Sequence, residues 1–379
     1  MRLIHLSDLH LGKRVHGFSM LEDQKYILKQ ILQIIRTEKP DGVLLAGDLY
    51  DKAIPPAEAV ELLDDFLVAL AEKNLQTFLI SGNHDSPERL AFGGRLMTAS
   101  GIHVSPVYHG QVQPISLTDD YGTVDLYLLP FLKPAHVRRY FPEGEITSYT
   151  DAMAAAIGEF PLVPEHRNVL VTHQFVTGAL PSDSEEISVG GTDHVDADVF
   201  HDFDYVALGH IHGPQNIGSP QIRYCGTPLK YSFSEAKHQK SVTVVELKGK
   251  GQLEIRTIPL KPLHDLVEIR GRYEEITRRS FYENTAWQTD YIHITLTDEE
   301  DIPDAVGKLR SIYHNLMKLD YDNKRTQSQV EIQANEQVER KTPLQLFSEF
   351  YQMQNNQPMS EEQAEFVEKW IKQVWEGEQ

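Results

Sequence analysis

Short apolar runs alternate with amphipathic segments along the N-terminal part of the chain. Leu3–Ser7, Val43–Ala46 and Thr77–Ile80 have the length and the apolar content of buried strands. Between them, apolar residues recur at helical spacing over Leu21–Thr37, and a second helical pattern runs from Pro55–Pro56 to about Glu72. Strands that alternate with helices in this way predict right-handed crossovers and a parallel sheet.

Further along the chain, strand-like segments follow one another more closely. We therefore expect an α/β fold with four layers, in which two packed sheets are flanked by helices and which ends near Leu260. Tyr149–Gly158 is rich in Ala and predicts a helix. The expected strands are Val112–Leu117, Val124–Leu129, Val169–Thr172, Tyr205–Gly209, Ile222–Tyr224, Ser241–Leu247 and Leu253–Ile258.

Pro259–Pro262 indicates a linker, and the residues beyond it predict a small α+β module. Leu266–Arg270 and Tyr291–Leu296 are its expected strands, and Ile302–Met317 is its expected helix. Asp322–Gln337 is polar and predicts little regular structure. The module is therefore expected to be a separate domain.

Large apolar side chains recur near the end of the chain. They predict two amphipathic helices separated at Gln354–Pro358, with Ser360 as the N-cap of the second. Little chain remains to bury these side chains, so they predict a docking surface for a partner. The alternative is that they fold back on residues 265–320. The large apolar side chains are Phe347, Phe350, Tyr351, Phe366, Trp370 and Trp375. The whole chain is therefore predicted to form three domains, at residues 1–260, 261–337 and 338–379.

Composition is that of a soluble globular protein. Of 379 residues, 40% are hydrophobic and 24% are charged, and no apolar run is long enough to span a bilayer. A single cysteine, Cys225, excludes an internal disulfide and fits a reducing cytoplasm, so we expect a cytoplasmic protein without membrane contact. The net charge of −20 is unusual for a protein that binds DNA alone. Bound cations and a partner would have to supply the positive field.

The apolar strands end in turns that carry typical metal ligands. In an extended strand, Asp8 and His10 would point to the same side and hold one ion together. One histidine among 17 is usually a surface or core residue, but here the same position type recurs at five strand ends. Such a set suits Mn²⁺, Fe or Zn²⁺, and two ions about 4 Å apart would organise an in-line attack on phosphorus. The candidate ligands are Asp8, His10, Asp48, Asn83, His173, His210 and His212, with His84 beside them.

These turns resemble the five motifs of the calcineurin-like metallophosphoesterases. In order, they are Asp8-Leu9-His10, Gly47-Asp48, Gly82-Asn83-His84-Asp85, Val171-Thr172-His173 and Gly209-His210-Ile211-His212. Gly47–Asp51 and Tyr224–Glu235 narrow the likeness to the SbcD family of bacterial nuclease subunits. The resemblance covers residues 1–260 strongly and the remainder by layout only.

The resemblance implies a role for each of these residues. Asp8, His10 and His212 would hold one ion, and Asn83, His173 and His210 would hold the other. Asp48 would bridge the two ions, for which Mn²⁺ is expected. His84 would protonate the leaving oxygen, and Asp85 would either fix the tautomer of His84 or simply cap the turn.

The resemblance also implies a substrate and partners. The chain would be a 3′→5′ exonuclease on double-stranded DNA and an endonuclease on single strands and hairpins, acting in recombination, replication and repair at the nucleoid. It would form a homodimer and work with the SMC-like ATPase SbcC, which would dock on the C-terminal helices. ATP would be bound by that partner, because this chain has no phosphate-binding loop of the Walker type. The middle module would cap the site and present DNA to it.

Two features of the sequence leave parts of this assignment open. Some relatives carry a further histidine where this chain has Asp51 and Lys52, so any role of that histidine is in doubt here. Basic residues near the motifs are candidate phosphate contacts, although solvated surface positions explain them equally well. They are Lys13, Arg14, Arg89 and Lys230, together with Arg95, Lys237 and Lys240.

Two other functions compete with the nuclease. A metallophosphatase or a cyclic-nucleotide phosphodiesterase would share the chemistry, but the additional C-terminal modules argue against both. A metal-free scaffold that only binds proteins would lack ligands, whereas all seven ligand positions are filled here.

Overall fold

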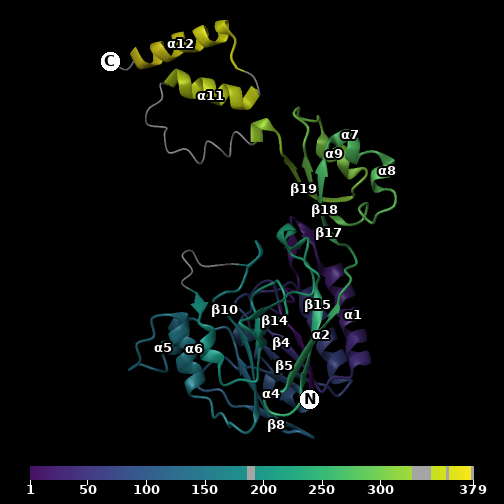
Figure 1. Cartoon of the computed structure of the whole chain (residues 1–379), viewed down its shortest axis with the longest axis vertical. Helices are drawn as coiled ribbons and strands as arrows, with labels where there is room; N and C mark the ends of the chain where they lie inside the picture. Colours follow the sequence, from purple (N-terminus) through teal and green to yellow (C-terminus); the bar gives the residue numbers. More distant parts are fainter. Residues whose placement is uncertain (186–192, 327–342, 356–357, 377–379) are drawn as a thin grey trace. The chain divides into compact units, whose positions relative to one another are not determined.

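The computed structural model describes residues 1–185, 193–326, 343–355 and 358–376, and it divides into two compact units, Met1–Asp265 and Leu266–Gln379 (Figure 1). No helix within the described ranges is both long and apolar enough to cross a bilayer. Of the predicted polar stretch Asp322–Gln337, residues 327–337 lie outside these ranges.

The first sheet of the larger unit contains the predicted parallel strands. Its order is β16-β15-β1-β4-β5-β6, and β1, β4, β5 and β6 run parallel while β15 pairs antiparallel with β1. Helices α1 and α2 form the crossovers, as predicted. The bounds are β1 Arg2–Leu6, α1 Leu21–Glu38, β4 Gly42–Ala46, α2 Ala57–Ala71, β5 Gln76–Ile80, β6 Ile102–Val104, β15 Ser241–Leu247 and β16 Leu253–Pro259.

The second sheet has the order β13-β14-β12-β9-β8-β7, with parallel strands in its centre and antiparallel strands at both edges. The strand predicted at Val112–Leu117 begins only at Ile115, so that prediction was wrong by three residues. The bounds are β7 Ile115–Asp119, β8 Gly122–Leu129, α5 Pro134–Arg138, α6 Tyr149–Gly158, β9 Arg167–His173, β12 Tyr205–Gly209, β13 Gln215–Ile217 and β14 Ser219–Tyr224.

Short elements complete this unit. They are β2 Arg14–Val15, β3 Phe18–Ser19, α3 Pro87–Leu90, α4 Gly94–Met97, β10 Phe175–Val176, β11 His194–Val195, and 3₁₀ turns at Thr98–Ser100, Ala197–Phe200 and Phe233–Glu235.

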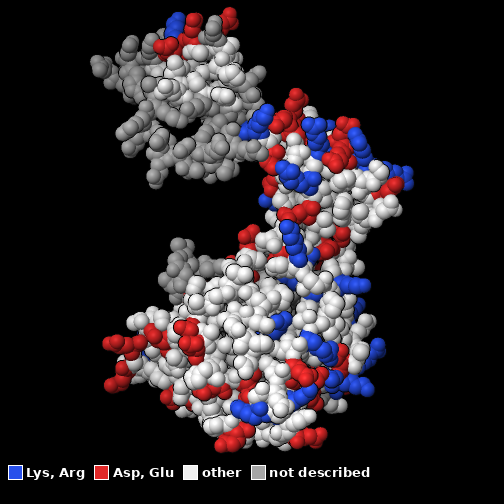
Figure 2. Space-filling model, in the orientation of Figure 1, with Lys and Arg blue, Asp and Glu red and all other residues white. Residues whose placement is uncertain are grey.

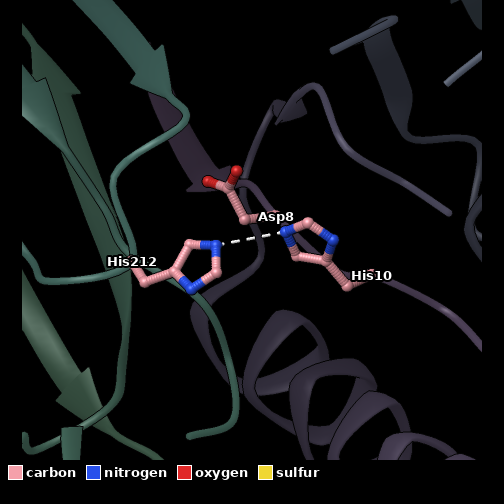
Figure 3. A group of neighbouring side chains, drawn as sticks. All are labelled: Asp8, His10 and His212. Atoms are coloured by element: carbon pink, nitrogen blue, oxygen red, sulfur yellow. Dashed lines mark hydrogen bonds between the residues drawn. The ribbon is translucent and has the colours of Figure 1, made fainter. Parts of the chain in front are cut away.

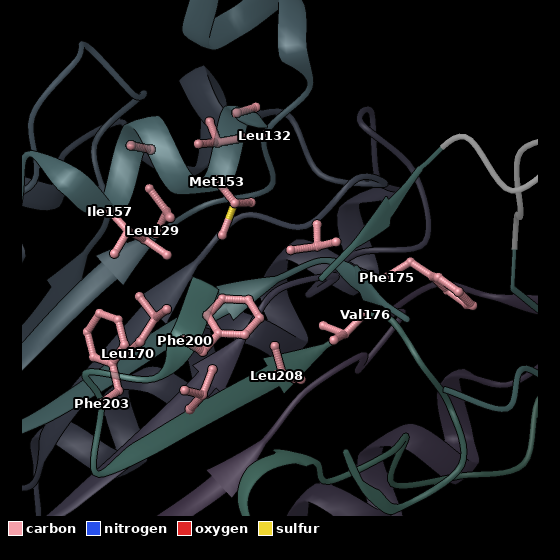
Figure 4. Close-up of a cluster of buried hydrophobic side chains, with 14 of the residues drawn as sticks. Leu129, Leu132, Met153, Ile157, Leu170, Phe175, Val176, Phe200, Phe203 and Leu208 are labelled. Atoms are coloured by element: carbon pink, nitrogen blue, oxygen red, sulfur yellow. The ribbon is translucent and has the colours of Figure 1, made fainter. Parts of the chain in front are cut away.

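Two hydrophobic layers hold the sheets and helices together. Alternate residues of the second sheet face in opposite directions, so Val169 packs toward Leu44 and Phe78 of the first sheet, while Leu170 packs toward Met153 of α6 (Figure 4). Layers of helix, sheet, sheet and helix result, which confirms the predicted fold class. Both sheets turn the carboxyl ends of their central strands to one edge, where the candidate ligands lie.

The smaller unit begins with a parallel three-stranded sheet of order β17-β18-β19. The helix predicted over Ile302–Met317 was wrong, because only its middle is helical and its end begins β19. Pairing with β18 overrides the helical preference of Leu316 and Met317, whose side chains are buried there. The bounds are β17 Leu266–Gly271, α7 Tyr273–Ile276, α8 Arg279–Tyr282, β18 Tyr291–Leu296, α9 Ala305–Arg310 and β19 Asn315–Tyr321.

The two predicted C-terminal helices are α11 (Pro343–Asn355) and α12 (Glu361–Glu376). Ser360 caps α12 as predicted, because its hydroxyl accepts a hydrogen bond from Gln363 N at 3.3 Å while Gln363 Oε1 accepts one from Ser360 N at 2.9 Å. The side chain of Trp375 lies outside the described part of the chain.

Candidate metal centre

The eight side chains predicted for the site lie together where strands of both sheets end. Asp8 and His10 follow β1, Asp48 follows β4, and Asn83 and His84 follow β5, all in the first sheet. From the second sheet, His173 ends β9, while His210 and His212 follow β12. Residues separated by up to about 200 positions therefore meet at one edge, as expected for the carboxyl ends of parallel strands.

The backbone at the ligands differs from the extended strand that the sequence suggested. Asp8, His10 and Asp48 have φ of 54°, 44° and 48°, in the left-handed region that residues other than glycine rarely adopt. Main-chain hydrogen bonds hold this conformation, from Asp8 N to Gly47 O and from His10 N to Asp48 O, both 2.9 Å. Strained residues of this kind cluster at functional sites, where the surrounding structure enforces them.

The first group of ligands consists of Asp8, His10 and His212 (Figure 3). The Nε2 atoms of the two histidines face each other at 3.1 Å. The carboxylate of Asp8 accepts hydrogen bonds from His210 N at 3.0 and 3.2 Å, which fixes its orientation. Ring nitrogens and carboxylate oxygens thus converge on one point, as the ligands of a cation do.

The second group surrounds His173. Its Nδ1 lies 2.8 Å from Ala46 O and donates a hydrogen bond to it, so the neutral ring carries its lone pair on Nε2. Nε2 faces Asn83 Oδ1 at 2.9 Å and Asp48 Oδ2 at 3.2 Å, and Nδ1 of His210 lies 3.0 Å from the same Asn83 oxygen. In the neutral ring, the lone pair of His173 Nε2 faces two acceptor oxygens, and a cation between these atoms would resolve the conflict. The residues therefore fit a second metal ion.

Electrostatics of the metal-free protein support this interpretation. Burial would lower the pKa of His173, but the carboxylate of Asp48 outweighs it and raises the pKa to about 9. A proton on Nε2 can then take the place of the metal. Burial raises the pKa of Asp8 to about 6, with partial compensation by His173 and His212. Burial also lowers the pKa of His10 well below its usual value, which keeps its ring neutral and able to bind a metal.

Comparison with known proteins agrees with this geometry. The profile of the family described as calcineurin-like phosphoesterase matches residues 1–214, and one described as Type 5 capsule protein repressor C-terminal domain matches residues 262–355. A Staphylococcus epidermidis protein, named as the D subunit of the nuclease SbcCD, is 33% identical over 374 residues, which cover 97% of each chain. One of the same name from Staphylococcus saprophyticus is 34% identical over 323 residues, 84% of each chain. The chain belongs to the SbcD family.

SbcD-family membership makes the chain a phosphodiester hydrolase, a nuclease that binds divalent metal ions. Among solved structures, TT1561 of Thermus thermophilus has a TM-score of 0.35 at 13% identity and covers 68% of this chain and 98% of that one. A likeness this weak adds nothing to the family assignment.

In this SbcD-family chain, His84 lies at the rim of the centre and is oriented by two contacts. The main-chain N–H of His84 donates to Asp48 Oδ1 at 2.9 Å, and its ring Nδ1 donates to the carbonyl oxygen of Asp51 at 3.0 Å. Asp85 does not fix the tautomer. Its carboxylate instead accepts hydrogen bonds from the main-chain N–H groups of Leu49, Tyr50 and Gly82 at 3.1, 2.9 and 2.9 Å.

The candidate DNA contacts differ in exposure and in whether their side chains already have hydrogen-bond or ion-pair partners. Arg89 is exposed, and Arg14 is exposed apart from a hydrogen bond to Gly17 O. Lys13 is paired with Asp51 at 2.8 Å, and Lys230 donates to Ala236 O at 2.7 Å and is paired with Asp265 at 2.8 Å. Both lysines would have to give up partners to reach a phosphate.

Lys240, in contrast, cannot contact DNA in this conformation. It is 4% exposed and pairs with the buried carboxylate of Glu235, while it also donates to His212 O at 2.9 Å. Sequence reasoning missed this support of His212 and the contribution of Ser184, whose Oγ lies 2.6 Å from His212 Nδ1. The only signal was that Glu235 closes the stretch that resembles the SbcD family; nothing marked Ser184.

Proposed function

We propose that this chain is the Mn²⁺-dependent DNA nuclease subunit of a complex with the ATPase SbcC. The observation that carries the proposal is the convergence of seven oxygen and nitrogen ligands on two adjacent points, with no thiolate among them. Imidazole, carboxylate and amide ligands suit Mn²⁺ better than a thiolate-preferring metal. The name printed for its relatives, which makes them part of the nuclease SbcCD, supports both the substrate class and the partner.

The residues divide the catalytic task between them. We assign Asp8, His10 and His212 to one ion, Asn83, His173 and His210 to the other, and Asp48 to both. Divalent ions bound there supply an activated water and neutralise charge on the phosphate. His84, whose Nδ1–H is committed to Asp51 O, presents Nε2 to the substrate side and, when protonated, gives that proton to the leaving oxygen.

We propose DNA as the substrate, cut 3′→5′ from double-stranded ends and internally in hairpins and single strands. The chain has a net charge of −20, and Figure 2 shows Lys and Arg scattered among Asp and Glu on the visible face of its described part. Contacts to phosphate would therefore be local, at Arg14 and Arg89 and, after release of their partners, at Lys13 and Lys230. The partner would supply the rest of the positive field.

A homodimer is supported by an apolar patch beside the site. Phe92 and Leu96 project from the surface with 87% and 82% exposure. Next to them, Val60, Leu63 and Leu67 of α2 line a groove of about 590 Å³. A surface that offers both projecting apolar side chains and an apolar groove can pair with itself around a two-fold axis, because each copy fills the groove of the other.

We propose α11 and α12 as the docking surface for the coiled coil of SbcC. Phe347, Phe350, Phe366 and Trp370 are all exposed to at least two-fifths of their surface. Phe366 and Trp370 are one helical turn apart with ring centroids 6.4 Å from each other, so they form one apolar face. Residues 1–260 would then form the nuclease domain, 261–337 the cap that presents DNA, and 338–379 the docking domain.

Hairpin DNA cleavage with Mn²⁺, measured with and without SbcC, tests the proposal. We expect His84→Ala to lose about 10²–10⁴-fold in cleavage rate while it still binds two ions, because His84 gives a proton and is not a ligand. His201→Ala, which removes an exposed histidine outside the site, should cleave normally. Loss of metal from His84→Ala would show that His84 is a ligand. Hydrolysis of bis-p-nitrophenyl phosphate by a wild type that leaves hairpins intact would favour the phosphatase alternative.

A further inference from the structure

A chain of hydrogen bonds runs from His212 into a buried ion pair. His212 Nδ1 lies 2.6 Å from Ser184 Oγ, and Ser184 Oγ lies 2.6 Å from Glu235 Oε1. Behind Glu235, Lys240 pairs with the other carboxylate oxygen and donates to Thr227 Oγ1 at 2.7 Å. Side chains of Glu235 and Lys240 are 0% and 4% exposed, so water does not compete for these contacts.

The direction of each hydrogen bond follows from the groups involved. An ionised carboxylate only accepts, so the Ser184 hydroxyl donates its proton to Glu235. Ser184 Oγ can then only accept from His212, which places the ring proton on Nδ1. The lone pair of His212 consequently lies on Nε2, the atom that faces His10. Ser184 and Glu235 thus fix the tautomer that a metal ligand at Nε2 requires.

The two metal positions are supported in different ways. In the second group, His173 donates to Ala46 O, a main-chain carbonyl inside β4. In the first group, the ring of His212 is oriented by the side chain of Ser184, which lies in the segment that follows β10. That segment is attached by hydrogen bonds of its own, from His212 N to Glu185 Oε1 at 2.6 Å and from Asp183 N to Ser234 Oγ at 3.0 Å.

We propose that the Ser184–Glu235–Lys240 relay sets the metal affinity of the Asp8–His10–His212 position alone. Ser184 and Glu235 are positioning residues, because they act through His212 and touch no substrate. The second position keeps its main-chain anchor whatever happens to the relay. This inference rests on the proposed two-metal site. It adds that the metal affinity of one position can be lowered without changing the affinity of the other.

Mn²⁺ titration followed by electron paramagnetic resonance tests the relay, because a coupled Mn²⁺ pair and a single Mn²⁺ give different spectra. We expect Ser184→Ala to weaken one of the two binding steps about 10–100-fold and to show the signal of a single ion at concentrations that fill both positions in the wild type. Ser184→Thr keeps the hydroxyl and should restore the pair. Ser234→Ala removes a hydroxyl that holds the same segment without contacting His212, and should bind as the wild type does.

Nitrogen-15 NMR of the metal-free protein gives a second measurement. Ser184→Ala should weaken the preference of His212 for the Nδ1–H tautomer, because the remaining acceptor, Glu235 Oε1, lies 3.4 Å from Nδ1 compared with 2.6 Å for Ser184 Oγ. A general loss of stability would not produce this effect. Wild-type affinity for both ions in Ser184→Ala, or equal weakening of both steps, would overturn the relay. A wild type that binds no pair of ions would instead contradict the proposed function.

Discussion

Gly209 allows the two sheets to approach each other directly beneath the metal centre. A Cβ at this position would lie 1.8 Å from Ala46 O and 2.6 Å from His173 Nδ1, and neither atom can move without displacing a strand or a ligand. Ala46 O is also the acceptor that orients His173. The candidate metal site therefore requires a residue without a side chain at position 209.

Replacement of Gly209 by alanine should damage the site and the stability together. We expect a loss of about 1–3 kcal/mol in the free energy of unfolding, because the sheets are forced apart, and a loss of Mn²⁺ binding through displacement of His173. Gly158→Ala is the matched control, since no atom lies within 4 Å of its Cβ position and its φ is not positive. Chemical denaturation and metal titration measure both effects. Normal metal binding by Gly209→Ala would show that the sheets can separate without moving the ligands.

At the scale of single residues, the sequence predicted which side chains gather but not how they are held. Asp8, Asp48 and His173 were visible because each stands where an apolar strand ends. The left-handed backbone at Asp8 and His10 was not, since it depends on hydrogen bonds to the turn after β4. Ser184 was also invisible, because its only functional contacts are with residues 28 and 51 positions away.

At the scale of elements, one carboxylate joins the turns that follow β4 and β5. Asp85 accepts hydrogen bonds from Leu49 and Tyr50 in one turn and from Gly82 in the other. These turns carry Asp48 and Asn83, which we assign as ligands of the proposed metal ions. Asp85 therefore fixes the separation between ligands that it does not touch itself.

Asp85→Asn should weaken the hydrogen bonds that join the turns after β4 and β5. An amide offers only one acceptor oxygen and directs its N–H groups at other donors, so we expect a stability loss of about 1–3 kcal/mol and weaker Mn²⁺ binding. Asp151→Asn is a control with similar chemistry, because Asp151 also accepts from two main-chain N–H groups, of Thr147 and Ser148, but at the start of α6. The Asp151→Asn variant should lose stability but keep the metal affinity of the wild type. If both variants bound Mn²⁺ equally well, the turns would be held by other contacts.

Prediction of the elements was most accurate where strands are buried on both faces. The apolar runs of β4 and β5 are unambiguous, and α1 shows a clear helical period. The sequence failed at β19, where residues with helical preference form a strand because β18 offers a partner edge. Local pattern cannot reveal such pairing, since the edge belongs to a segment about 25 residues away.

At the scale of the whole molecule, the acidic charge and the apolar surface limit how the protein can work alone. A net charge of −20 opposes binding to DNA except where cations lie. Phe92 and Leu96, with the groove beside them, form an exposed apolar patch that monomeric proteins seldom maintain. Composition indicated that a partner is needed, but the position of the patch required the structure, because α2 and the residues after α3 line it together.

The patch predicts that the chain pairs with itself, and Phe92→Glu combined with Leu96→Glu should prevent this. Two carboxylates per copy would have to enter a mostly apolar groove whose lining already holds Asp64 and Glu88 beside Arg89, a cost that an interface of ordinary affinity cannot offset. Size-exclusion chromatography with light scattering should give twice the chain mass for the wild type and the mass of one chain for the variant.

Tyr121→Glu is the control for this prediction. It changes an exposed aromatic residue in the turn between β7 and β8, and the variant should remain dimeric. Because the patch lies outside the metal centre, the monomeric variant should still bind two Mn²⁺ ions. A variant that stays dimeric would place the interface elsewhere, and a wild type of single mass without SbcC would make dimer formation depend on the partner.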